Sequence, residues 1–578
     1  MTETDEPEPK GAIPLSESSR IHVNQIGYLP GQRKVAAVVG PVNTRTFCVT
    51  ESETGRVVFQ GELTGPIADA TSGDEVWHAD LTALSQPGAY RLTVDGVGTS
   101  PVIRVGADVL TDITKAVFKA FYFQRCGMAL DSSHAGPWHH AACHTADARL
   151  PNPDGGWLDA RRPHRGGWHD AGDYGKYTAP GAKAVADLLL AYAFAPALGQ
   201  VSWNIPESGQ GLPDVLAECR YELLWLLQMQ DPATGGVHHK VTTKRFPGLT
   251  VMPEDDTDEW YFSPISATAT ASFAAVLALA SRFYRPYDPA FSRRCLQAAE
   301  HAWAWLAAHP EVPGFRNPPD VFTGEYGDPN DADERFWAAV ELYRTTGRAE
   351  YQDAAIALCN GRVFNPYGLG WADVGGYGAI ACLFAAGLED DEAGGTRLTP
   401  APAHEWPFAD ELRAGFLALA DHLAGRTTES GYLHSLREED FIWGSNMEAA
   451  NRAMHLFLAH RLTGDERYAQ AARHHLDYLL GLNPLGQCYV TGFGSRPVQH
   501  PHHRPSVADG VEAPVPGLLA GGPNRGLQDE AARQHLAGRP PAKCYLDHAG
   551  SYATNEIAIY WNSPLAFALA AAWFTPAG

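Results

Sequence analysis

Two carboxylates stand three residues apart in the glycine-rich stretch GGWHDAGDYGKY, which runs from Gly166 to Tyr177. Like charges in a crowded site push each other's pKa values apart. One member of the pair Asp170 and Asp173 can then hold a water whose proton the other takes. A turn capped by aspartate has the same residues, and the stretch alone leaves both interpretations open.

A third acid stands by itself where an apolar helical run begins. Glu556 lies within CYLDHAGSYATNEIAIYWNSPLAFALA, from Cys544 to Ala570, close in sequence to Tyr552, Tyr560 and Trp561. A carboxyl near apolar rings keeps its proton to higher pH, as a general acid must. The structural alternative is an ordinary glutamate in a first helical turn, which the helix dipole favours.

A histidine-rich loop has the sequence YVTGFGSRPVQHPHHRPS, from Tyr489 to Ser506. It has little helical character and carries His500, His502, His503 and Arg504. Such side chains suit hydrogen bonding to sugar hydroxyls or the orientation of a carboxylate. A histidine cluster can also bind metal, but no thiol or carboxylate joins this one at a suitable spacing.

Thiols and imidazoles gather in an earlier segment of the chain. Two cysteines and a histidine lie within about twenty residues, with further histidines near them, which meets the Cys₂His₂ requirement of a tetrahedral zinc site. The spacing is not that of a zinc finger, and buried free thiols with surface histidines are the alternative. The residues concerned are Cys126, Cys143, His144, His139, His140, His164 and His169.

Several chemistries have no support in the sequence. No P-loop lysine motif, GxGxxG or GxSxG occurs, which argues against phosphate, dinucleotide and serine-hydrolase chemistry. The 44 Lys and Arg against 67 Asp and Glu give a net charge of −23, which argues against nucleic acid and anionic lipid as partners. Aromatic residues make up 10% of the chain, with 15 Trp, whose faces suit sugar rings as well as cores.

The elements that must position these residues change character near residue 108. Short β-branched or alternating runs, separated by turns at roughly ten-residue spacing, predict an Ig-type β-sandwich over 20–105. From 108 to 578 the pattern predicts about twelve helices, including one over 373–387 and one over 554–575. A weak repeat of helical hairpins fits an α/α toroid as well as an irregular bundle.

Taken together, these stretches resemble the glycoside hydrolase family 9 cellulases that carry an N-terminal Ig-like domain. The start, SRIHVNQIGYLPGQRKVAAVV, is similar to that domain, and GGWHDAGDYGKY is similar to the motif that bears the family's base. YVTGFGSRPVQHPHHR and YLDHAGSYATNEIAIYWNS are similar to two further active-site signatures, and FIWGSN and MPEDDTD also match family stretches. The resemblance covers about residues 20–578 and implies an (α/α)₆ barrel after the Ig-like domain.

The resemblance implies inverting hydrolysis of β-1,4-glucosidic bonds, with Asp173 as general base and Asp170 as its partner on the water. Glu556 is implied as the general acid, and His502 and Arg504 are implied to hold the sugar at the cleavage point. Inversion needs room for a water between base and acid. The carboxyl groups of Asp173 and Glu556 are therefore expected roughly 6.5–9.5 Å apart.

Two structural metals are also implied by the resemblance. Thiolates and imidazoles suit zinc, and hard oxygen ligands suit calcium, although acids in the first turn of a helix would explain the second set equally well. The implied zinc ligands are Cys126, Cys143, His144 and His169, with His164 in reserve for the last, and the implied calcium ligands are Asp333, Glu334 and Asp373.

We therefore expect an endo-β-1,4-glucanase, monomeric, acting on β-1,4-glucan polysaccharide or cello-oligosaccharide. The alternative within the family is an exo-acting β-glucosidase or exo-β-glucosaminidase that cuts short oligosaccharides. A non-catalytic carbohydrate-binding protein is disfavoured because Asp170, Asp173 and Glu556 are all present. The first twenty residues have no apolar run typical of a signal peptide, so we expect the cytoplasm, or secretion with the signal already removed. No run of about 18 apolar residues predicts a membrane span.

Overall fold

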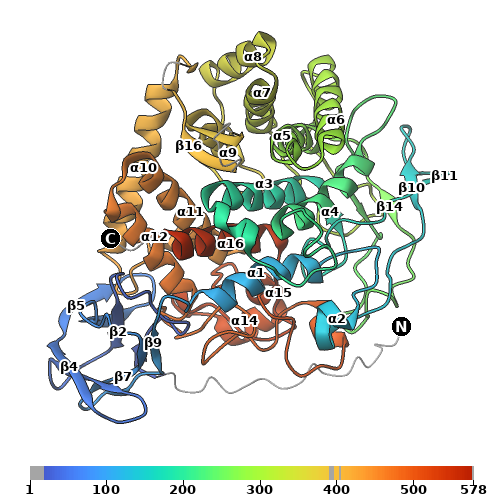
Figure 1. Cartoon of the computed structure of the whole chain (residues 1–578). Helices are drawn as coiled ribbons and strands as arrows, with labels where there is room; N and C mark the ends of the chain where they lie inside the picture. The colour runs from blue at the N-terminus through green and yellow to red at the C-terminus, as the bar shows by residue number, and fades with distance from the viewer. Residues whose placement is uncertain (1–18, 389–395, 403–404, 576–578) are drawn as a thin grey trace.

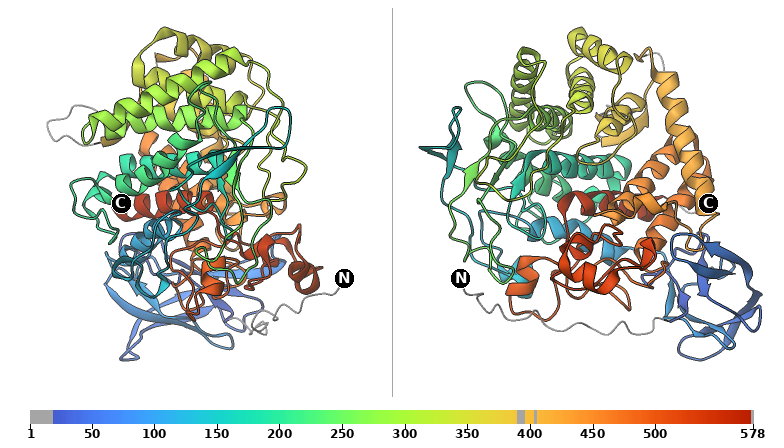
Figure 2. Two further views of the ribbon diagram at one scale, coloured as in Figure 1. Left: turned by 90° about the vertical axis from the view of Figure 1, so that its right-hand side faces the viewer. Right: turned by 180° about the vertical axis from the view of Figure 1, so that it is seen from behind.

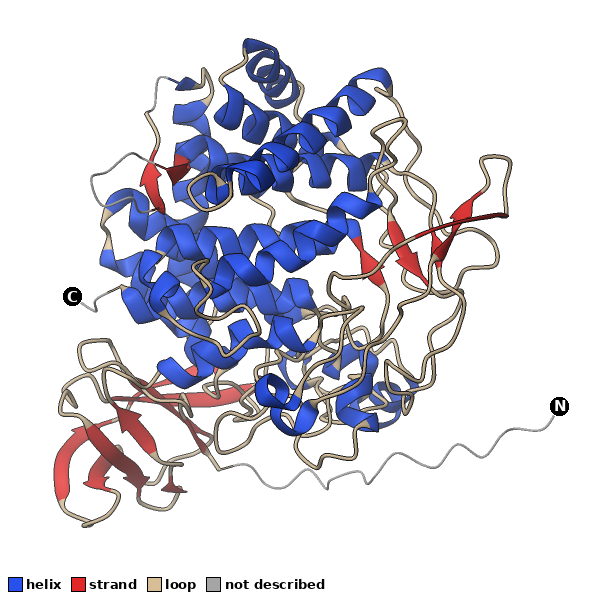
Figure 3. Ribbon diagram, turned by 45° about the vertical axis from the view of Figure 1, so that its right-hand side comes forward, coloured by secondary structure: helices blue, strands red, loops and turns tan. Residues whose placement is uncertain are grey.

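The structure is a computed structural model that describes residues 19–388, 396–402 and 405–575 of the 578-residue chain. It contains an N-terminal β-sandwich and a larger helical body (Figure 1). Coloured by secondary structure, the sandwich lies against one corner of the helical body (Figure 3).

Two antiparallel sheets form the sandwich. One has the strand order β1–β2–β6–β5 and the other β4–β3–β7–β8, with β9 also paired to β7. Along β7, Tyr90, Leu92 and Val94 are buried and alternate with exposed residues, which is the period of a half-buried strand. The predicted Ig-type β-sandwich is therefore present. The strands are β1 (Ile21–His22), β2 (Val35–Val39), β3 (Thr46–Glu51), β4 (Val57–Glu62), β5 (Thr64–Asp69), β6 (Asp74–Asp80), β7 (Gly88–Val94), β8 (Gly98–Thr99) and β9 (Ile103–Val105).

Twelve helices of nine or more residues occur in the described part of the chain, as the helical periodicity predicted. None of the described helices is long and apolar enough to cross a membrane. They are α1 (Thr111–Phe123), α3 (Thr178–Phe194), α4 (Asp214–Met229), α5 (Ala267–Tyr284), α6 (Pro289–Ala308), α7 (Ala332–Thr346), α8 (Ala349–Asn360), α9 (Gly375–Leu383), α10 (Ala409–Thr427), α11 (Ser445–Thr463), α12 (Glu466–Leu479) and α16 (Ile559–Phe574).

The helices form two layers. In the inner layer α3 packs on α5, α5 on α7 and α7 on α9. Helix α11 packs on α16, and α16 packs on α3. Each outer helix covers an inner one: α1 covers α16, α4 covers α3, α6 covers α5, α8 covers α7, and α10 and α12 cover α11. Helices α3, α5 and α16 are buried almost along their whole length because apolar and small residues occur on every side. The arrangement is an α/α barrel, and Figure 2 shows it from two further sides.

Two features of the helical body differ from the sequence-based expectation. The helix expected over 373–387 ends at Leu383, and the chain continues as β15 (Phe384–Leu388), paired with β16 (Thr396–Pro400). A short apolar run such as FAAGL fits helix and strand equally well, so periodicity could not separate them. A small five-stranded sheet, mostly antiparallel but with β10 parallel to β14, also lies beside the barrel. Its strands are β10 (Ala148–Pro151), β11 (Trp157–Arg162), β12 (Lys176–Tyr177), β13 (Lys240–Thr242) and β14 (Tyr261–Phe262).

The sandwich and the barrel share a buried, hydrogen-bonded contact. The Asn24 amide donates to Asp477 Oδ1 at 2.8 Å, and Asp69 Oδ2 accepts from Ser430 Oγ at 3.0 Å. A small apolar cluster crosses the same contact, so both polar and apolar groups hold the two parts together. Its buried members are Val35, Ala37, Val76, Tyr432, Leu433 and Leu482.

Candidate active site

The stretch Gly166–Tyr177 lies between α1 and α3, and backbone hydrogen bonds fix it on two sides. The His169 N–H donates to the carbonyl of Gln124, at the end of α1, at 2.7 Å. The Ile559 N–H, at the start of α16, donates to the carbonyl of Asp170 at 2.7 Å. The two candidate carboxylates of this stretch are thereby placed between the ends of two barrel helices.

A glycine in this stretch lets the histidine-rich loop approach it. A Cβ on Gly172 would lie 2.0 Å from the carbonyl oxygen of His502, so only glycine fits here. The carbonyl of Gly172 accepts from the backbone N–H of Arg504 at 3.1 Å and from its Nη1 at 2.8 Å. The structure thus brings the loop of His502 and Arg504 directly against the stretch that carries Asp170 and Asp173.

Glu556 lies between two helices and not in a helical turn. Helix α15 (Tyr552–Asn555) ends just before it, α16 begins at Ile559, and the backbone at Glu556 is extended. The helix expected over 554–575 is therefore interrupted, and the helix dipole does not account for this glutamate. Its backbone pairs with that of His502, which joins the acid's segment to the histidine-rich loop.

One cleft of about 800 Å³ brings these segments together. Asp170, Asp173 and Glu556 all line it, as do His502 and Arg504. Rigid aromatic faces with few, well-placed polar groups are suited to binding a sugar ring. The aromatic lining consists of Tyr177, Phe246, Tyr326, Trp371, Trp443, Tyr552, Tyr560 and Trp561.

Asp170 is almost fully buried and accepts a hydrogen bond from a tyrosine that the sequence analysis did not identify. The Tyr326 hydroxyl donates to Oδ2 at 2.6 Å, and the Tyr326 ring packs edge-on against Trp371 and Tyr560. Burial raises the pKa of Asp170 well above its ordinary value; the Tyr326 hydrogen bond opposes this rise, and the charge of Asp173 adds to it. Oδ1 has no hydrogen-bond partner among the described residues.

The other two carboxyl groups of the cleft are electrostatically coupled. Burial raises the pKa of Asp173 above its ordinary value, although the Arg504 guanidinium and a 2.7 Å hydrogen bond from Gly175 N–H oppose the rise. Burial also raises the pKa of Glu556 well above its ordinary value; the charges of Asp173 and Asp170 add to the rise and Arg504 opposes it. An ionised Asp173 therefore helps to keep Glu556 protonated, which is the pattern of a base and an acid in one site.

His502 and Arg504 offer complementary hydrogen-bonding groups to the cleft. His502 Nδ1–H donates to the carbonyl of Ala549 at 2.6 Å, which leaves Nε2 as an acceptor. Burial lowers the pKa of His502 to about 4, so the ring is neutral at pH 7. Arg504 Nε donates to the carbonyl of Pro247 at 3.0 Å, which fixes the guanidinium. A neutral imidazole acceptor and a fixed guanidinium donor can both bind sugar hydroxyls.

The four side chains expected to bind zinc converge on one point. Their ligand atoms lie within 4.8 Å of one another, and all four residues are buried. His144 Nδ1 is 3.3 Å from His169 Nε2 and 3.5 Å from Cys126 Sγ, close to the edges of a tetrahedron with metal–ligand bonds of about 2.0–2.3 Å. The reserve candidate His164 is outside this group, which consists of Cys126, Cys143, His144 and His169.

A carboxylate outside this group orients one of its histidines. Asp256, from the stretch MPEDDTD, places Oδ2 3.3 Å from Nε2 of His144. Histidines that bind metal commonly bond a carboxylate through their other ring nitrogen, which fixes the tautomer. The donor set and this outer carboxylate both fit a closed zinc site.

The acids expected to bind calcium do not form a compact group like that of the zinc candidates. Asp333 and Glu334 lie in the first turn of α7, and Asp333 Oδ2 accepts from the N–H of Val374, beside Asp373. Both carboxylate oxygens of buried Glu334, and Oδ2 of Asp328, have no hydrogen-bond partner in the described part of the chain. None of these acids belongs to a group as tight as the Cys and His quartet. Calcium here stays a prediction.

Comparison with known families decides the class of protein to which this cleft belongs. Residues 111–569 match the family described as Glycosyl hydrolase family 9, and residues 16–99 match the Cellulase N-terminal ig-like domain. The chain belongs to glycosyl hydrolase family 9. It is therefore a glycoside hydrolase, and the resemblance described from its motifs is confirmed.

Individual relatives match this family 9 hydrolase over nearly its whole length. A cellodextrinase of Butyrivibrio fibrisolvens is 38% identical over 95% of this chain and 99% of its own. A xyloglucan-specific endo-β-1,4-glucanase of Bacteroides ovatus is 37% identical, covering 94% and 92% of the two chains. A solved endoglucanase from Alicyclobacillus acidocaldarius is 43% identical with a TM-score of 0.87, covering 96% and 100%. A solved zinc-binding triple mutant of another family 9 endoglucanase is 34% identical with a TM-score of 0.84, covering 94% and 99%.

Proposed function

We propose that this family 9 hydrolase is an endo-β-1,4-glucanase that cleaves β-1,4-glucans with inversion at the anomeric carbon. The observation that carries this proposal is that Asp170, Asp173 and Glu556 line a single aromatic cleft. Relatives named as endo-β-1,4-glucanase and endoglucanase, at 37% and 43% identity, support the choice of substrate class.

In the proposed reaction Asp173 is the general base. It deprotonates a water that Asp170 also holds. Asp170 binds this water through Oδ1, the carboxylate oxygen that Tyr326 leaves free. Hydrogen bonds from Tyr326 to Asp170 and from Gly175 to Asp173 fix the two carboxylates before substrate binds. Such fixed acceptors orient the water for attack on the anomeric carbon.

Glu556 is the proposed general acid and protonates the leaving glycosidic oxygen. Its raised pKa keeps the proton available near neutral pH, and the nearby ionised base contributes to that rise. Inversion needs a water between the two groups, so we expect the carboxyl groups of Asp173 and Glu556 to be roughly 6.5–9.5 Å apart. His502 and Arg504 are proposed to hold the sugar at the cleavage point.

A second candidate function is cleavage of short oligosaccharides from one end. The relative at 38% identity is named a cellodextrinase, and its match extends over 99% of its own length. An exo-acting enzyme of the same family would use the same three carboxylates, so the catalytic residues do not separate the two candidates. The distinction lies in how many sugars bind on each side of the cleaved bond.

Product analysis tests both candidates. An endo-acting enzyme releases a mixture of short oligosaccharides from cellohexaose and lowers the viscosity of a soluble β-glucan early in the reaction. An exo-acting enzyme releases one product length from the start and leaves the viscosity high. No new reducing ends from cellohexaose, xyloglucan or chitosan oligosaccharides would contradict both proposals.

We also propose that Cys126, Cys143, His144 and His169 hold a structural zinc. The convergence of two thiols and two imidazoles supports this, as does the triple mutant of a related endoglucanase that is named as zinc-binding. When bound, such a zinc would have four protein ligands, so it would stabilise the fold next to Asp170 and take no part in the reaction. Calcium held by Asp333, Glu334 and Asp373, with Asp328, is a further proposal, supported by the unpaired carboxylate oxygens of Glu334 and Asp328. Elemental analysis of protein purified without chelator tests both.

A further inference from the structure

Gln124, the residue that follows the last turn of α1, connects the two loops of the candidate active site through its buried side chain. We propose that Gln124 is a positioning residue that fixes the stretch bearing Asp170 and Asp173 relative to the loop bearing His502 and Arg504. The inference rests on the proposed function, because it assigns these two loops to the base and to sugar binding.

The amide nitrogen of Gln124 holds the base-bearing stretch. Nε2 donates to the carbonyl of His169 at 3.0 Å and to the carbonyl of Ala171 at 3.0 Å. These carbonyls flank Asp170 on both sides. Because carbonyl oxygens only accept, the two contacts also assign the orientation of the amide: nitrogen toward the base-bearing stretch and oxygen away from it.

The amide oxygen of Gln124 holds the sugar-binding loop through His503. Oε1 accepts from Nε2–H of His503 at 2.9 Å, and His503 Nδ1 then accepts from the Ser506 hydroxyl at 2.8 Å. Ser506 Oγ in turn accepts from the N–H of Val515 at 3.0 Å. Every donor in this buried chain has an acceptor, so only one arrangement of its protons satisfies all of them.

His503 is aimed at Gln124 by the extended backbone of its loop. The φ and ψ angles of His503 are −146° and 109°, and successive side chains of an extended segment point to opposite faces. His502 and Arg504 line the cleft, whereas His503 does not and is buried on the opposite side. The bond between Gln124 and His503 therefore holds the rear of the loop whose front faces the sugar.

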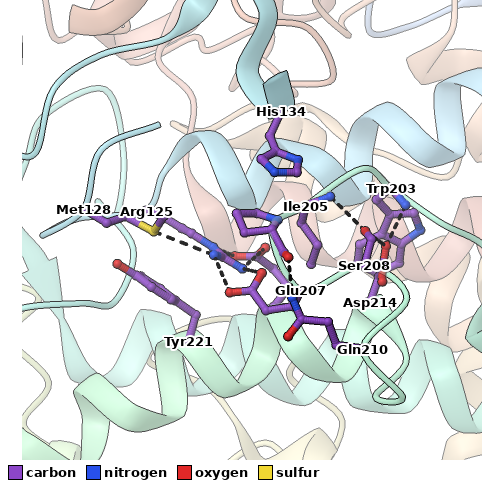
Figure 4. Close-up of polar contacts among 12 residues, drawn as sticks. Arg125, Met128, His134, Trp203, Ile205, Glu207, Ser208, Gln210, Asp214 and Tyr221 are labelled. Carbon is purple, nitrogen blue, oxygen red and sulfur yellow. Dashed lines mark hydrogen bonds and ion pairs between the residues drawn. The ribbon is translucent and has the colours of Figure 1, made fainter. Parts of the chain in front are cut away.

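Arg125, the next residue, makes this attachment rigid. Figure 4 shows its guanidinium between Glu207 and Tyr221, and two further hydrogen bonds join it to Glu218 of α4. The Arg125 side chain is fully buried, and Glu218 also accepts from the indole N–H of Trp168 at 2.9 Å. The backbone of Gln124 is thus held in place on the barrel. Its amide nitrogen and amide oxygen can then limit the movement of the two loops that they bind.

Losing this connection should change catalysis more than substrate binding. The aromatic lining of the cleft would still bind the glucan, but the sugar held by His502 and Arg504 would shift relative to Asp173. A displacement of about 1 Å in reacting groups costs about 10²-fold in rate. A residue that only stabilised the fold would lower the melting temperature and leave kcat per folded molecule unchanged.

The test compares Gln124→Met with Gln230→Met in the full chain. Methionine keeps the length of glutamine and removes its hydrogen bonds. Gln230 is a matched control because it is half-buried and its amide also donates to two carbonyls, of Gly235 and Ala298, which belong to neither loop. We expect Gln124→Met to lower kcat on a soluble β-glucan by about 10–100-fold with KM within about threefold. Gln230→Met should change neither.

A double-mutant cycle and hydrogen exchange complete the experiment. His503→Leu removes the same bond from its other end, so Gln124→Met and His503→Leu should lower kcat by similar factors and the double variant by no more than either. Amide exchange should rise in residues 168–173 and 502–506 in both single variants, a readout that needs no activity. If the wild type cleaves no β-glucan, the proposed function fails while the exchange result still judges Gln124.

Three outcomes would overturn the inference: kcat of Gln124→Met within twofold of wild type, additive effects of the two substitutions, or unchanged exchange in both loops. If Gln124→Met does not fold, His503→Leu decides alone by the same kcat, KM and exchange measurements.

Discussion

The hydroxyl of Tyr326 donates a 2.6 Å hydrogen bond to Oδ2 of Asp170, while Oδ1 of the same carboxylate has no partner in the described part of the chain. The tyrosine therefore fixes the plane of the carboxylate and leaves one oxygen free to accept. Tyr326 holds this position at a cost, because its backbone is left-handed, with φ of 48°. A non-glycine residue in this conformation, next to a catalytic candidate, indicates that the position of the Tyr326 side chain serves the function of the site.

Replacing this tyrosine should slow the reaction without weakening substrate binding. Tyr326→Phe keeps the ring that packs on Trp371 but removes the hydrogen bond to a charged group, worth about 1.5–3 kcal/mol. We expect kcat to fall about 10–100-fold with KM nearly unchanged. Tyr560→Phe is the control, since the Tyr560 hydroxyl contacts Tyr326 at 3.2 Å and no catalytic carboxylate. Equal losses in the two variants would contradict the orienting role of Tyr326.

The three carboxylates should differ from all other acids of the chain in their effect on rate. Asp173→Asn and Glu556→Gln preserve shape and should each lower kcat by about 10²–10⁴-fold, the usual contribution of general acid–base catalysis. Asp170→Asn should also be severe, because the water loses a charged acceptor. Circular dichroism should show intact folding in each variant. Proton NMR of wild-type product should show the α-anomer first, and a β-anomer first would refute the base role of Asp173.

The charge of Arg504 should affect both the acidic and the alkaline limb of the pH dependence of kcat. In the proposed mechanism, activity should fall at low pH when Asp173 is protonated and at high pH when Glu556 is ionised. The Arg504 charge lowers the pKa of both groups. Removing it in Arg504→Met should therefore raise both pKa values and move the whole bell of kcat against pH to higher pH, in addition to weakening substrate binding. Phe246→Leu alters the same wall without changing charge and should leave both limbs in place. A bell that narrows or moves to lower pH would contradict the assignment.

The sequence predicted those candidate residues that lie in contiguous motifs. Asp170 and Asp173 share one glycine-rich stretch, and Glu556 lies in a second stretch similar to a family signature, so the family resemblance pointed to all three. Tyr326 and Gln124 could not be found in this way, because their partners lie far along the chain. The contact of Tyr326 with Asp170 spans 156 residues, and that of Gln124 with His503 spans 379. Only the closed barrel brings such pairs together.

Zinc removal should destabilise the protein before it affects the chemistry. Cys143→Ser removes one of four converging ligands, so the purified variant should contain less than one zinc per chain and melt at lower temperature. Cys48→Ser is the control, because Cys48 lies in the sandwich, away from the quartet. Unchanged melting temperature in Cys143→Ser, or no zinc in the wild type, would contradict the proposed site.

A buried histidine at the contact between sandwich and barrel should make the fold sensitive to acid. His474, on α12, is 2% exposed, and neither ring nitrogen has a hydrogen-bond partner among the described residues. Burial, together with the nearby Arg33, His475, His78 and Arg473, lowers the pKa of His474 to about 3. The unfolded chain, with a histidine pKa of about 6.5, then binds more protons below that pH than the folded chain does.

Because the unfolded chain binds more protons at His474, the folded protein loses stability as the pH falls. Stability from the neutral His474 is fully present above pH 6.5 and is lost as pH falls from there toward about 3. One proton of difference is worth about 1.4 kcal/mol per pH unit, so the loss between pH 6.5 and pH 5 is about 2 kcal/mol. His474→Phe cannot be protonated and should unfold in urea with a smaller difference between pH 7 and pH 5 than wild type. Exposed His422→Phe should keep the wild-type difference, and a His474→Phe difference as large as that of wild type would refute the argument.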